Sequence, residues 1–344
     1  MPNVIVIGNC QAAPLANTLQ QLPGVPTARS LAVNEQGSKR FVEIDAELQP
    51  LLDVAETQVF TFPIKGDHGG YSTEALRRRG ARVKTITNLF FNGLHPDITY
   101  VGAMNSRLQS PLGDYHSRIV LDAFLEGRSQ ADCVAMFNQL EYERRGYFDA
   151  YARSANELLE RDAGVDVPFA QEFLRMVPQL PTLMTFNHPT SVVFQAYGAR
   201  LAAELGMTLP RFPAAFLKNP LANSVIWPVY RELGKAHGLS YTTPMAFRQP
   251  DSRGGSFLKL EEFIKRSYAQ YVQHGQALRE AWTGQNFATV DGLESDGVVS
   301  DPDSVISRDP VPTQVVKASA APVRPGPVDA AFGRLRDIVK SRSR

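Results

Sequence analysis

The first twenty or so residues of the chain have a strand-like hydrophobic pattern followed by a helix-like one. Val4 to Ile7 form a run of β-branched hydrophobic residues, and Gly8 ends the run. Pro14 and three leucines at helical spacing follow, which indicates a helix that begins just after the turn. The pattern therefore predicts a strand, a tight turn and a helix.

Further β-rich runs follow in the first hundred residues. They lie at Gln58 to Ile64, Val83 to Phe91 and Ile98 to Val101, and the segment from Ser72 to Gly80 between the first two has a helical pattern. Strands that alternate with helices are typical of a parallel sheet. We therefore predict an α/β arrangement for this part of the chain.

The pattern changes to one helix after another from Asp114 to Val177. We interpret residues 105–180, approximately, as a large helical insertion. Thr182 to Phe186 then has the composition of a buried strand, and Pro189 opens a further helix. The sequence thus predicts that the α/β pattern resumes after the insertion.

The C-terminal third contains two more predicted helices, at residues 224–237 and 257–282. After these the periodicity fades, and six prolines fall within residues 301–327. Such a composition favours an extended linker over a packed core. We therefore expect a flexible tail at residues 284–344, with one short helix at about 330–339.

Composition and charge exclude several classes of protein. The chain has 344 residues, enough for one large or two modest globular units, and 36 Lys and Arg against 35 Asp and Glu give a net charge of +1. This balance gives no reason to expect a nucleic acid partner. No apolar run approaches the roughly 18 residues that span a bilayer, and the start lacks the features of a secretory signal. We expect a cytoplasmic protein that does not span a membrane.

The two cysteines have to be considered singly, because a structural disulfide is not expected without an export signal. Cys10 lies in the turn formed by Gly8, Asn9, Cys10 and Gln11, where the N–H groups of a helix N-terminus favour a thiolate or an oxyanion. An isolated cysteine is more often a small buried hydrophobe, but this placement favours a function. A dinucleotide site is less well supported, because the further glycines of that fingerprint are missing.

A second candidate is His188, which lies between Asn187 and Pro189 where a strand meets a helix. The proline restricts the backbone of the histidine, and the helix dipole favours the neutral ring that a general base needs. A capping or packing role is the alternative.

Two other histidines lie at element boundaries, His95 beside Asp97 and His116 beside Tyr115, where they could form sites, turns or caps. No spacing of histidine and carboxylate residues matches a metal template, and we predict no metal site. The remaining histidines are expected to be surface or structural residues: His68, His237 and His274.

The densest basic cluster is Arg77 to Arg79, with Lys65 before it and Arg82 and Lys84 behind it. These side chains could bind phosphate groups. A solvated helix face is the more usual meaning of such a run.

Four blocks of the sequence together resemble the WcbI-type polysaccharide biosynthesis family. They are Val4 to Gln11, Phe90 to Asp97, Leu112 to His116 and Phe186 to Thr190, and they match in order and spacing. The resemblance covers about residues 1–283, so that stretch is expected to form one acetyltransferase-like domain.

The resemblance implies an acetyltransferase that binds coenzyme A or acetyl-CoA. Its acceptor would be a carbohydrate, a sugar of a capsular or other surface polysaccharide or of a precursor, and other capsule biosynthesis proteins would be its partners. The fold that it implies is helix-rich α/β, with a small, mostly parallel sheet and a large helical insertion.

The resemblance also suggests roles for individual residues. His188 would be the general base, with Asn187 positioning it, and Cys10 would meet the thioester carbonyl. Asn9, Gln11 or Asn88 would donate a hydrogen bond to the developing oxyanion, which makes Asn9 a further candidate catalytic residue. Whether acetyl passes through a thioester on Cys10 or goes directly to the sugar stays open. The residues expected around the catalytic pair and the coenzyme are Gly8, Asn9, Gln11, Lys65, Arg78, Asn88 and His116.

One departure from the family pattern is Ser117, which follows His116 where an acidic residue is expected.

Two other functions fit the pair Cys10 and His188. An esterase with a Cys/His pair would not bind coenzyme A, and a noncatalytic coenzyme A-binding scaffold would tolerate the loss of Cys10 and His188.

Overall fold

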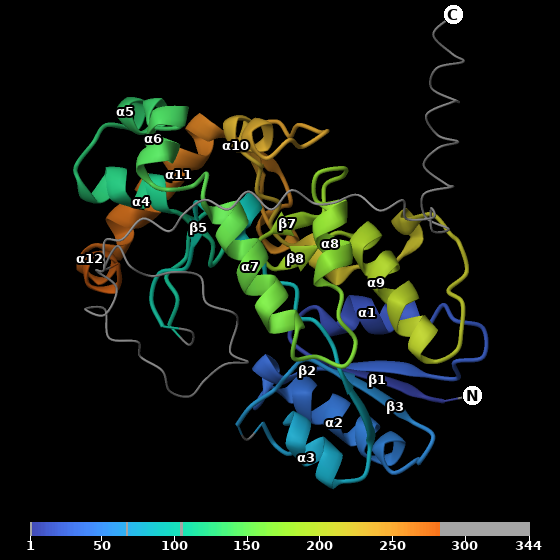
Figure 1. The fold of residues 1–344 in the computed structure, drawn as a ribbon. Coiled ribbons are helices and arrows are strands. Elements are labelled where there is room, and N and C mark those ends of the chain that lie inside the picture. Colours follow the sequence, from blue (N-terminus) through green and yellow to red (C-terminus); the bar gives the residue numbers. More distant parts are fainter. Residues whose placement is uncertain (1, 67, 104–105, 283–344) are drawn as a thin grey trace, which may run out of the picture. The chain divides into compact units, whose positions relative to one another are not determined.

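The hydrophobic start of the chain forms an inner strand of a four-stranded parallel sheet. The computed structural model describes residues 2–66, 68–103 and 106–282. The strand order is β2 (Ala28–Ala32), β1 (Val4–Gly8), β3 (Gln58–Thr61) and β4 (Arg82–Thr85) (Figure 1). The inner strands β1 and β3 are buried along their whole length, whereas the outer strands are partly exposed. This is the α/β sheet predicted from the alternating pattern.

The register of the sheet defines two opposite edges. Val4 lies beside Ala28 and Gln58, at the amino ends of the strands, and Gly8 lies beside Ala32 at the carboxyl ends. Because all four strands run in the same direction, the turns that follow them meet at one edge. Cys10 follows β1 directly and therefore lies at the carboxyl edge.

Helices cover both faces of the sheet. Helix α1 (Ala12–Leu19) lies on one face, and α2 (Lys39–Leu52) and α3 (Thr73–Arg78) lie on the other (Figure 1). Helix α9 (Ser191–Glu204) packs on α1. A Cβ atom at Gly198 of α9 would come within 2.3 Å of a Thr18 methyl, so only glycine permits this close approach.

The helical insertion is also confirmed. Ser129 caps α5 by accepting a hydrogen bond from the Asp132 N–H group. The helices of this part are α4 (Arg118–Leu125), α5 (Gln130–Ala135), α6 (Gln139–Arg144), α7 (Ala150–Asp162) and α8 (Ala170–Met176).

Beyond the insertion, the predicted strand at residues 182–186 is present but does not join the main sheet. Strand β7 (Leu183–Thr185) pairs instead with the short antiparallel strand β8 (His188–Pro189). Thr190 is the N-cap of α9, so the helix begins shortly after Pro189 as expected. His188 therefore lies immediately before a helix N-terminus.

The rest of the described chain contains short elements. The strands are β5 (Ile98–Thr99), β6 (His116–Ser117), β9 (Ala246–Arg248) and β10 (Phe257–Lys259), and the helices are α10 (Arg231–Ala236), α11 (Leu260–His274) and α12 (Gln276–Ala281). Single turns of 3₁₀ helix are η1 (Val33–Glu35), η2 (Asn92–Leu94), η3 (Ala214–Phe216), η4 (Pro220–Asn223) and η5 (Asp251–Arg253).

Several predicted boundaries were wrong. The strand expected at residues 83–91 ends at Thr85, because the chain leaves the sheet edge there, and the helix expected at 224–237 begins only at Arg231. The helix expected at 257–282 starts as a strand and is interrupted at Gly275, whose φ of +55° is not helical. Strand β2 and helix α2 were not predicted.

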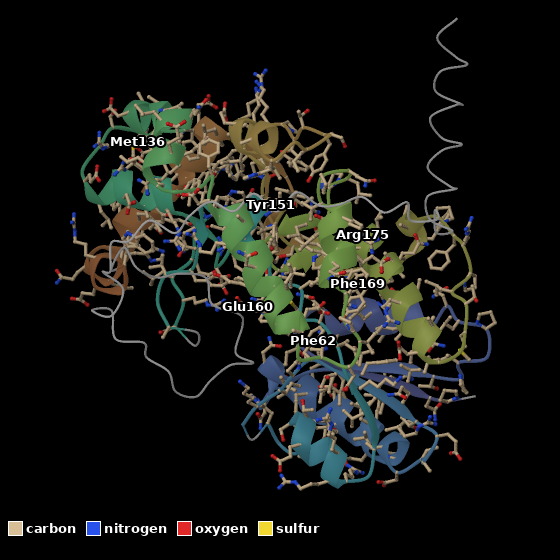
Figure 2. The ribbon with its side chains drawn as sticks, in the orientation of Figure 1. Phe62, Met136, Tyr151, Glu160, Phe169 and Arg175 are labelled. Carbon is tan, nitrogen blue, oxygen red and sulfur yellow. The ribbon has the colours of Figure 1, made fainter. Side chains whose placement is uncertain are left out.

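Two clusters of buried side chains form separate hydrophobic cores. The sheet core surrounds β1 and β3 and includes Phe62, and the helical core surrounds α4 and α11, with Met136 packed against it. Figure 2 shows Phe62 beside the sheet and Met136 among the helices of the insertion.

No helix within residues 2–66, 68–103 and 106–282 is long and apolar enough to cross a membrane. The tail predicted at residues 284–344, with its terminal helix, lies outside the described residues.

Candidate functional site

The turn that carries Cys10 is fixed by the residues on either side of it. A Cβ atom at Gly8 would lie 2.2 Å from the buried Phe62 ring, so glycine is required there. The Asn9 side-chain oxygen accepts a hydrogen bond from the Gln11 N–H group at 3.0 Å, which closes the turn. Helix α1 begins directly afterwards. The turn thus holds Cys10 at the N-terminal end of α1.

Gln11 ties this turn to two distant segments. Its fully buried side-chain amide donates to the backbone oxygens of Leu89 at 2.8 Å and Asn187 at 3.0 Å. Asn9 makes a further link, since its amide donates to the Asn88 side chain at 3.2 Å. The sequence blocks around residues 10, 90 and 187 are therefore joined by hydrogen bonds.

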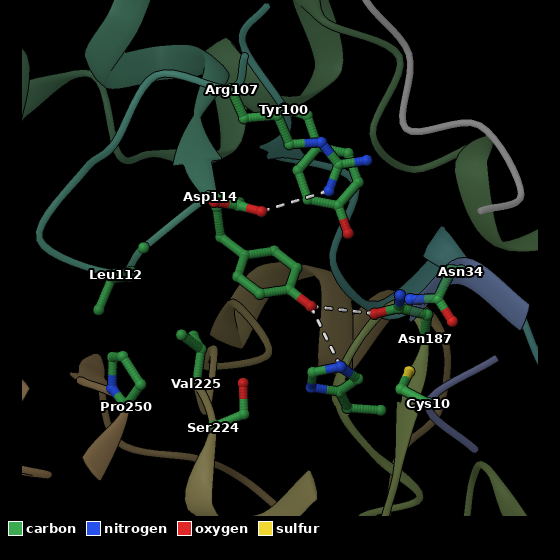
Figure 3. A pocket seen from close by; sticks show the side chains of 13 residues that line it. Cys10, Asn34, Tyr100, Arg107, Leu112, Asp114, Asn187, Ser224, Val225 and Pro250 are labelled. Carbon is green, nitrogen blue, oxygen red and sulfur yellow. Dashed lines mark hydrogen bonds and ion pairs between the residues drawn. The ribbon is translucent and has the colours of Figure 1, made fainter. Parts of the chain in front are cut away.

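A pocket of about 470 Å³ opens beside this junction. That volume lies within the ~300–1,000 Å³ typical of small-molecule sites. Figure 3 shows Cys10 and Asn187 next to each other on its wall. The lining residues are Cys10, Asn34, Tyr100, Arg107, Leu112, Gly113, Asp114, Tyr115, Asn187, His188, Ser224, Val225 and Pro250.

His188 is almost completely buried at this pocket, with 7% of its surface exposed. Its Nε2 atom lies 3.3 Å from the Tyr115 hydroxyl, while its Nδ1 atom is buried without a hydrogen-bond partner. Burial lowers the pKa of the ring from 6.5 to about 4, because the charged form loses its solvation. The ring is therefore neutral at physiological pH, as a general base requires.

The Asn187 side chain is oriented by two hydroxyl groups. Its oxygen accepts from Thr185 at 3.0 Å and from Tyr115 at 3.3 Å. The backbone oxygen of the same residue is held by Gln11. Asn187 therefore connects the Cys10 turn to the Tyr115 hydroxyl.

The charged side chains that line the pocket are Arg107 and Asp114. The Arg107 guanidinium lies 3.6 Å from the centroid of the Tyr100 ring, and it pairs with Asp114 at 3.4 Å (Figure 3). A stacked guanidinium is held in place by the ring, and its planar donors suit phosphate or carboxylate groups.

Of the residues predicted for the site, Cys10, Asn187 and His188 all line this pocket. Gly8, Asn9, Gln11 and Asn88 are not part of its lining and instead shape the turn behind it. The catalytic roles predicted for these residues stay predictions.

His116, which we predicted among the coenzyme ligands, does not line this pocket. It is fully buried in the helical part, where Nδ1 lies 3.0 Å from the Tyr271 hydroxyl and Nε2 lies 2.9 Å from the Leu108 oxygen. Both ring nitrogens thus have partners within the protein. A role in positioning the helices explains these contacts.

The Asp97 carboxylate is held by hydroxyl and N–H groups of the helical part. It is fully buried and accepts hydrogen bonds from the hydroxyls of Ser117 at 2.5 Å, Tyr147 at 2.8 Å and Tyr230 at 2.6 Å, and from the Ile119 N–H group at 3.0 Å. These donors replace the water that a buried carboxylate loses. The residue following His116, a serine rather than an acid, is part of this network.

Arg78 is also distant from the pocket, for a reason that the sheet register makes clear. It ends α3, just before β4 begins with Arg82, which lies beside Gln58 at the amino edge of the sheet. Cys10 lies at the opposite edge. Arg78 is exposed and pairs with Glu74 at 3.5 Å, and Lys65 is exposed and does not line the pocket. Arg78 therefore lies on a solvent-exposed helix end away from this pocket.

Sequence reasoning missed several lining residues: Asn34, Tyr100, Arg107 and Ser224. Asn34 follows β2 at the same edge as Cys10, so recognising that strand would have placed it there. The others lie in irregular segments, whose position no local pattern predicts. Within the part of the chain that the structure describes, no group of three or more His, Cys, Asp or Glu residues is arranged to hold a metal ion.

Comparisons with known proteins point to one family. A family model described as polysaccharide biosynthesis enzyme WcbI matches residues 3–210, more than half of the chain. A solved structure of WcbI, described as a novel polysaccharide biosynthesis enzyme in its native form without a disulfide bond between coenzyme A and a cysteine, has a similar fold. The TM-score is 0.56 at 15% identity, over 81% of this chain and 97% of the other. No curated protein sequence matches the chain.

Proposed function

The chain belongs to the WcbI family of polysaccharide biosynthesis enzymes, and from that premise we propose that it is an acetyltransferase. It would transfer the acetyl group of acetyl-CoA to a hydroxyl of a capsular or other surface polysaccharide, or of a precursor. The observation that carries this proposal is the single pocket lined by both Cys10 and His188. The coenzyme A and cysteine named for the structurally similar WcbI support the choice of donor.

Cys10 supplies the group that meets the thioester. It follows β1 and precedes α1, so the partial positive charge of the helix N-terminus stabilises either a thiolate or the oxyanion of a tetrahedral intermediate. The side-chain amides of Asn9 and Gln11 are engaged in holding the turn. We therefore assign these two residues to positioning Cys10 rather than to oxyanion binding.

His188 supplies the base. Its neutral ring accepts a proton from the attacking group, either the Cys10 thiol or the sugar hydroxyl. In the first route acetyl passes to the Cys10 sulfur, coenzyme A leaves and its sulfur takes up the proton from His188, and the sugar oxygen then gives its proton to His188 and displaces Cys10. In the second route the sugar oxygen attacks acetyl-CoA directly. Both routes form one C–O bond and break one C–S bond overall.

Arg107 is the side chain that we propose for binding the anionic part of the donor. Its guanidinium lines the pocket and is held by Tyr100 and Asp114. We propose Arg107 for this role instead of Arg78 and Lys65, because those two residues do not line the pocket.

The test is acetyl transfer by the purified full-length chain. Calorimetry with coenzyme A and acetyl-CoA should show binding, and a panel of sugar acceptors should identify an acetylated product by mass spectrometry. Intact mass after incubation with acetyl-CoA alone distinguishes the routes, since an adduct of one acetyl group on Cys10 requires the first.

Two outcomes would contradict the proposal. Hydrolysis of acetylated sugars without coenzyme A binding would identify an esterase. Coenzyme A binding that is accompanied by no transfer, and that survives replacement of Cys10 and His188 unchanged, would identify a scaffold.

A further inference from the structure

The two ring nitrogens of His188 have different surroundings at the pocket. Nε2 faces the Tyr115 hydroxyl at 3.3 Å, and Nδ1 is buried with no partner among the described residues. Tyr115 itself lines the pocket, with 8% of its surface exposed. The Tyr115 hydroxyl, which lies at the pocket and in contact with Nε2, therefore offers a path for a proton between the two.

We propose that Tyr115 is a catalytic residue that relays the proton from the attacking group to Nε2 of His188. The proposal rests on the proposed acetyl transfer and adds a residue to it. Hydrogen bonds of 3.3 Å are long, but catalytic hydrogen bonds often shorten only when substrate is bound.

The hydrogen bonds around Asn187 make the Tyr115 proton available for this relay. The Asn187 side-chain oxygen already accepts from Thr185 at 3.0 Å. It therefore keeps a donor when the Tyr115 hydroxyl turns from Asn187 toward His188. A hydroxyl with two alternative acceptors at equal distance can change partners without leaving a buried oxygen unpaired.

The Tyr115 ring is held in place by aromatic neighbours. Its centroid lies 5.4 Å from that of Tyr100 and 5.7 Å from that of Phe186, and it meets the His188 ring edge-on at 5.9 Å. These contacts leave the hydroxyl rotation as the main freedom of the side chain. The oxygen thus stays between the pocket and the imidazole.

The relay moves two protons and leaves tyrosine unchanged. The attacking O–H or S–H group gives its proton to the Tyr115 oxygen, while the Tyr115 proton moves to Nε2 of His188, which becomes imidazolium. The attacking atom then bonds to the acetyl carbon, and the C–S bond of the thioester breaks. The proton returns by the same path to the leaving sulfur.

The experiment compares Tyr115→Phe with wild type and with Tyr142→Phe. The control removes another tyrosine hydroxyl of the helical part, one that is buried without a hydrogen-bond partner. We expect Tyr115→Phe to lower single-turnover transfer about 10²-fold, in the range for loss of a proton-transfer group. The dissociation constant of coenzyme A should change less than twofold, and Tyr142→Phe should leave transfer unchanged.

A proton inventory separates a relay from a structural role. In mixtures of H₂O and D₂O, the transfer rate of wild type should depend on the fraction of D₂O along a curve, because two protons move in the rate-limiting step. The rate of Tyr115→Phe should depend on that fraction linearly. Transfer within threefold of wild type, or a slower rate with an unchanged inventory, would overturn the relay while leaving acetyl transfer intact. Absence of transfer in wild type would instead contradict the proposed function, and with it the relay.

Discussion

His116 in the helical core and His188 beside the sheet core are alike in burial and different in their partners. Burial lowers the pKa of both rings to about 4. The His116 Nε2 atom faces the Leu108 carbonyl, which can only accept, so Nε2 carries the proton and Nδ1 accepts from Tyr271. His188 faces a hydroxyl that can donate or accept, and its other nitrogen has no partner.

This difference distinguishes a structural histidine from a candidate catalytic one. The partners of His116 fix a single tautomer, so the ring cannot exchange a proton without breaking a buried hydrogen bond. His188 keeps both tautomers accessible beside a pocket. Burial and pKa are similar in the two cases, so the hydrogen-bond partners and the neighbouring pocket distinguish the two histidines.

The largest expected effect concerns the two cysteines. Cys10 packs against the sheet core, and Cys133 lies in the helical core. Cys10→Ala should abolish acetyl transfer, because the alanine has no group to meet the thioester. Cys133→Ser should retain it, since burial in the helical core raises the pKa of the Cys133 thiol to about 12 and keeps it unreactive. Turnover assays on both variants measure this, and full activity of Cys10→Ala would remove any chemical role for that residue.

The next effect separates the two histidines. His188→Ala should lower turnover by roughly 10²- to 10⁴-fold with little change in coenzyme A affinity. His116→Ala should leave turnover per folded molecule unchanged but lower the free energy of unfolding by about 2–4 kcal/mol, because it leaves a cavity and two unpaired groups. Turnover assays, calorimetry with coenzyme A and urea unfolding on each variant test whether one histidine affects turnover and the other stability. The same loss of turnover in both would contradict the comparison.

The third effect is a dependence of stability on pH. Because burial lowers the pKa of His116 and His188 from 6.5 to about 4, the unfolded chain binds protons between these values that the folded chain does not. Each ring should therefore lower the free energy of unfolding by about 1.4 kcal/mol per pH unit as pH falls from about 6.5 toward 4. Urea unfolding across this window should show a shallower slope in His116→Ala. An unchanged slope would show that this ring does not contribute.

The smallest effect is expected at the basic cluster. Arg78→Ala should leave coenzyme A affinity unchanged and alter stability by less than about 0.5 kcal/mol, since the side chain is exposed and distant from the pocket. Arg107→Ala, the matched change at the pocket, should weaken coenzyme A binding. Calorimetry with coenzyme A on both variants decides whether the phosphate groups bind at Arg107 or at the basic cluster. Weaker binding by Arg78→Ala would favour the basic cluster.

Local patterns predicted much of the fold near Cys10 and His188. A β-branched run ending in glycine, followed by a leucine-rich helix, specifies β1, the turn and α1, because each signal acts over a few residues. The same holds for His188, whose following proline restricts its backbone and precedes α9. The helical insertion was predicted from its periodicity.

Only the tertiary structure decided which of these pieces meet. Gln11 bonds to Leu89 and Asn187, 78 and 176 residues away, and no periodicity encodes such a contact. Arg78 lies at the edge of the sheet opposite Cys10, because Arg78 precedes a strand of the parallel sheet and Cys10 follows one. Local preferences depend on a residue's own neighbours in the chain, whereas a site depends on hydrogen bonds and packing between segments that folding brings together.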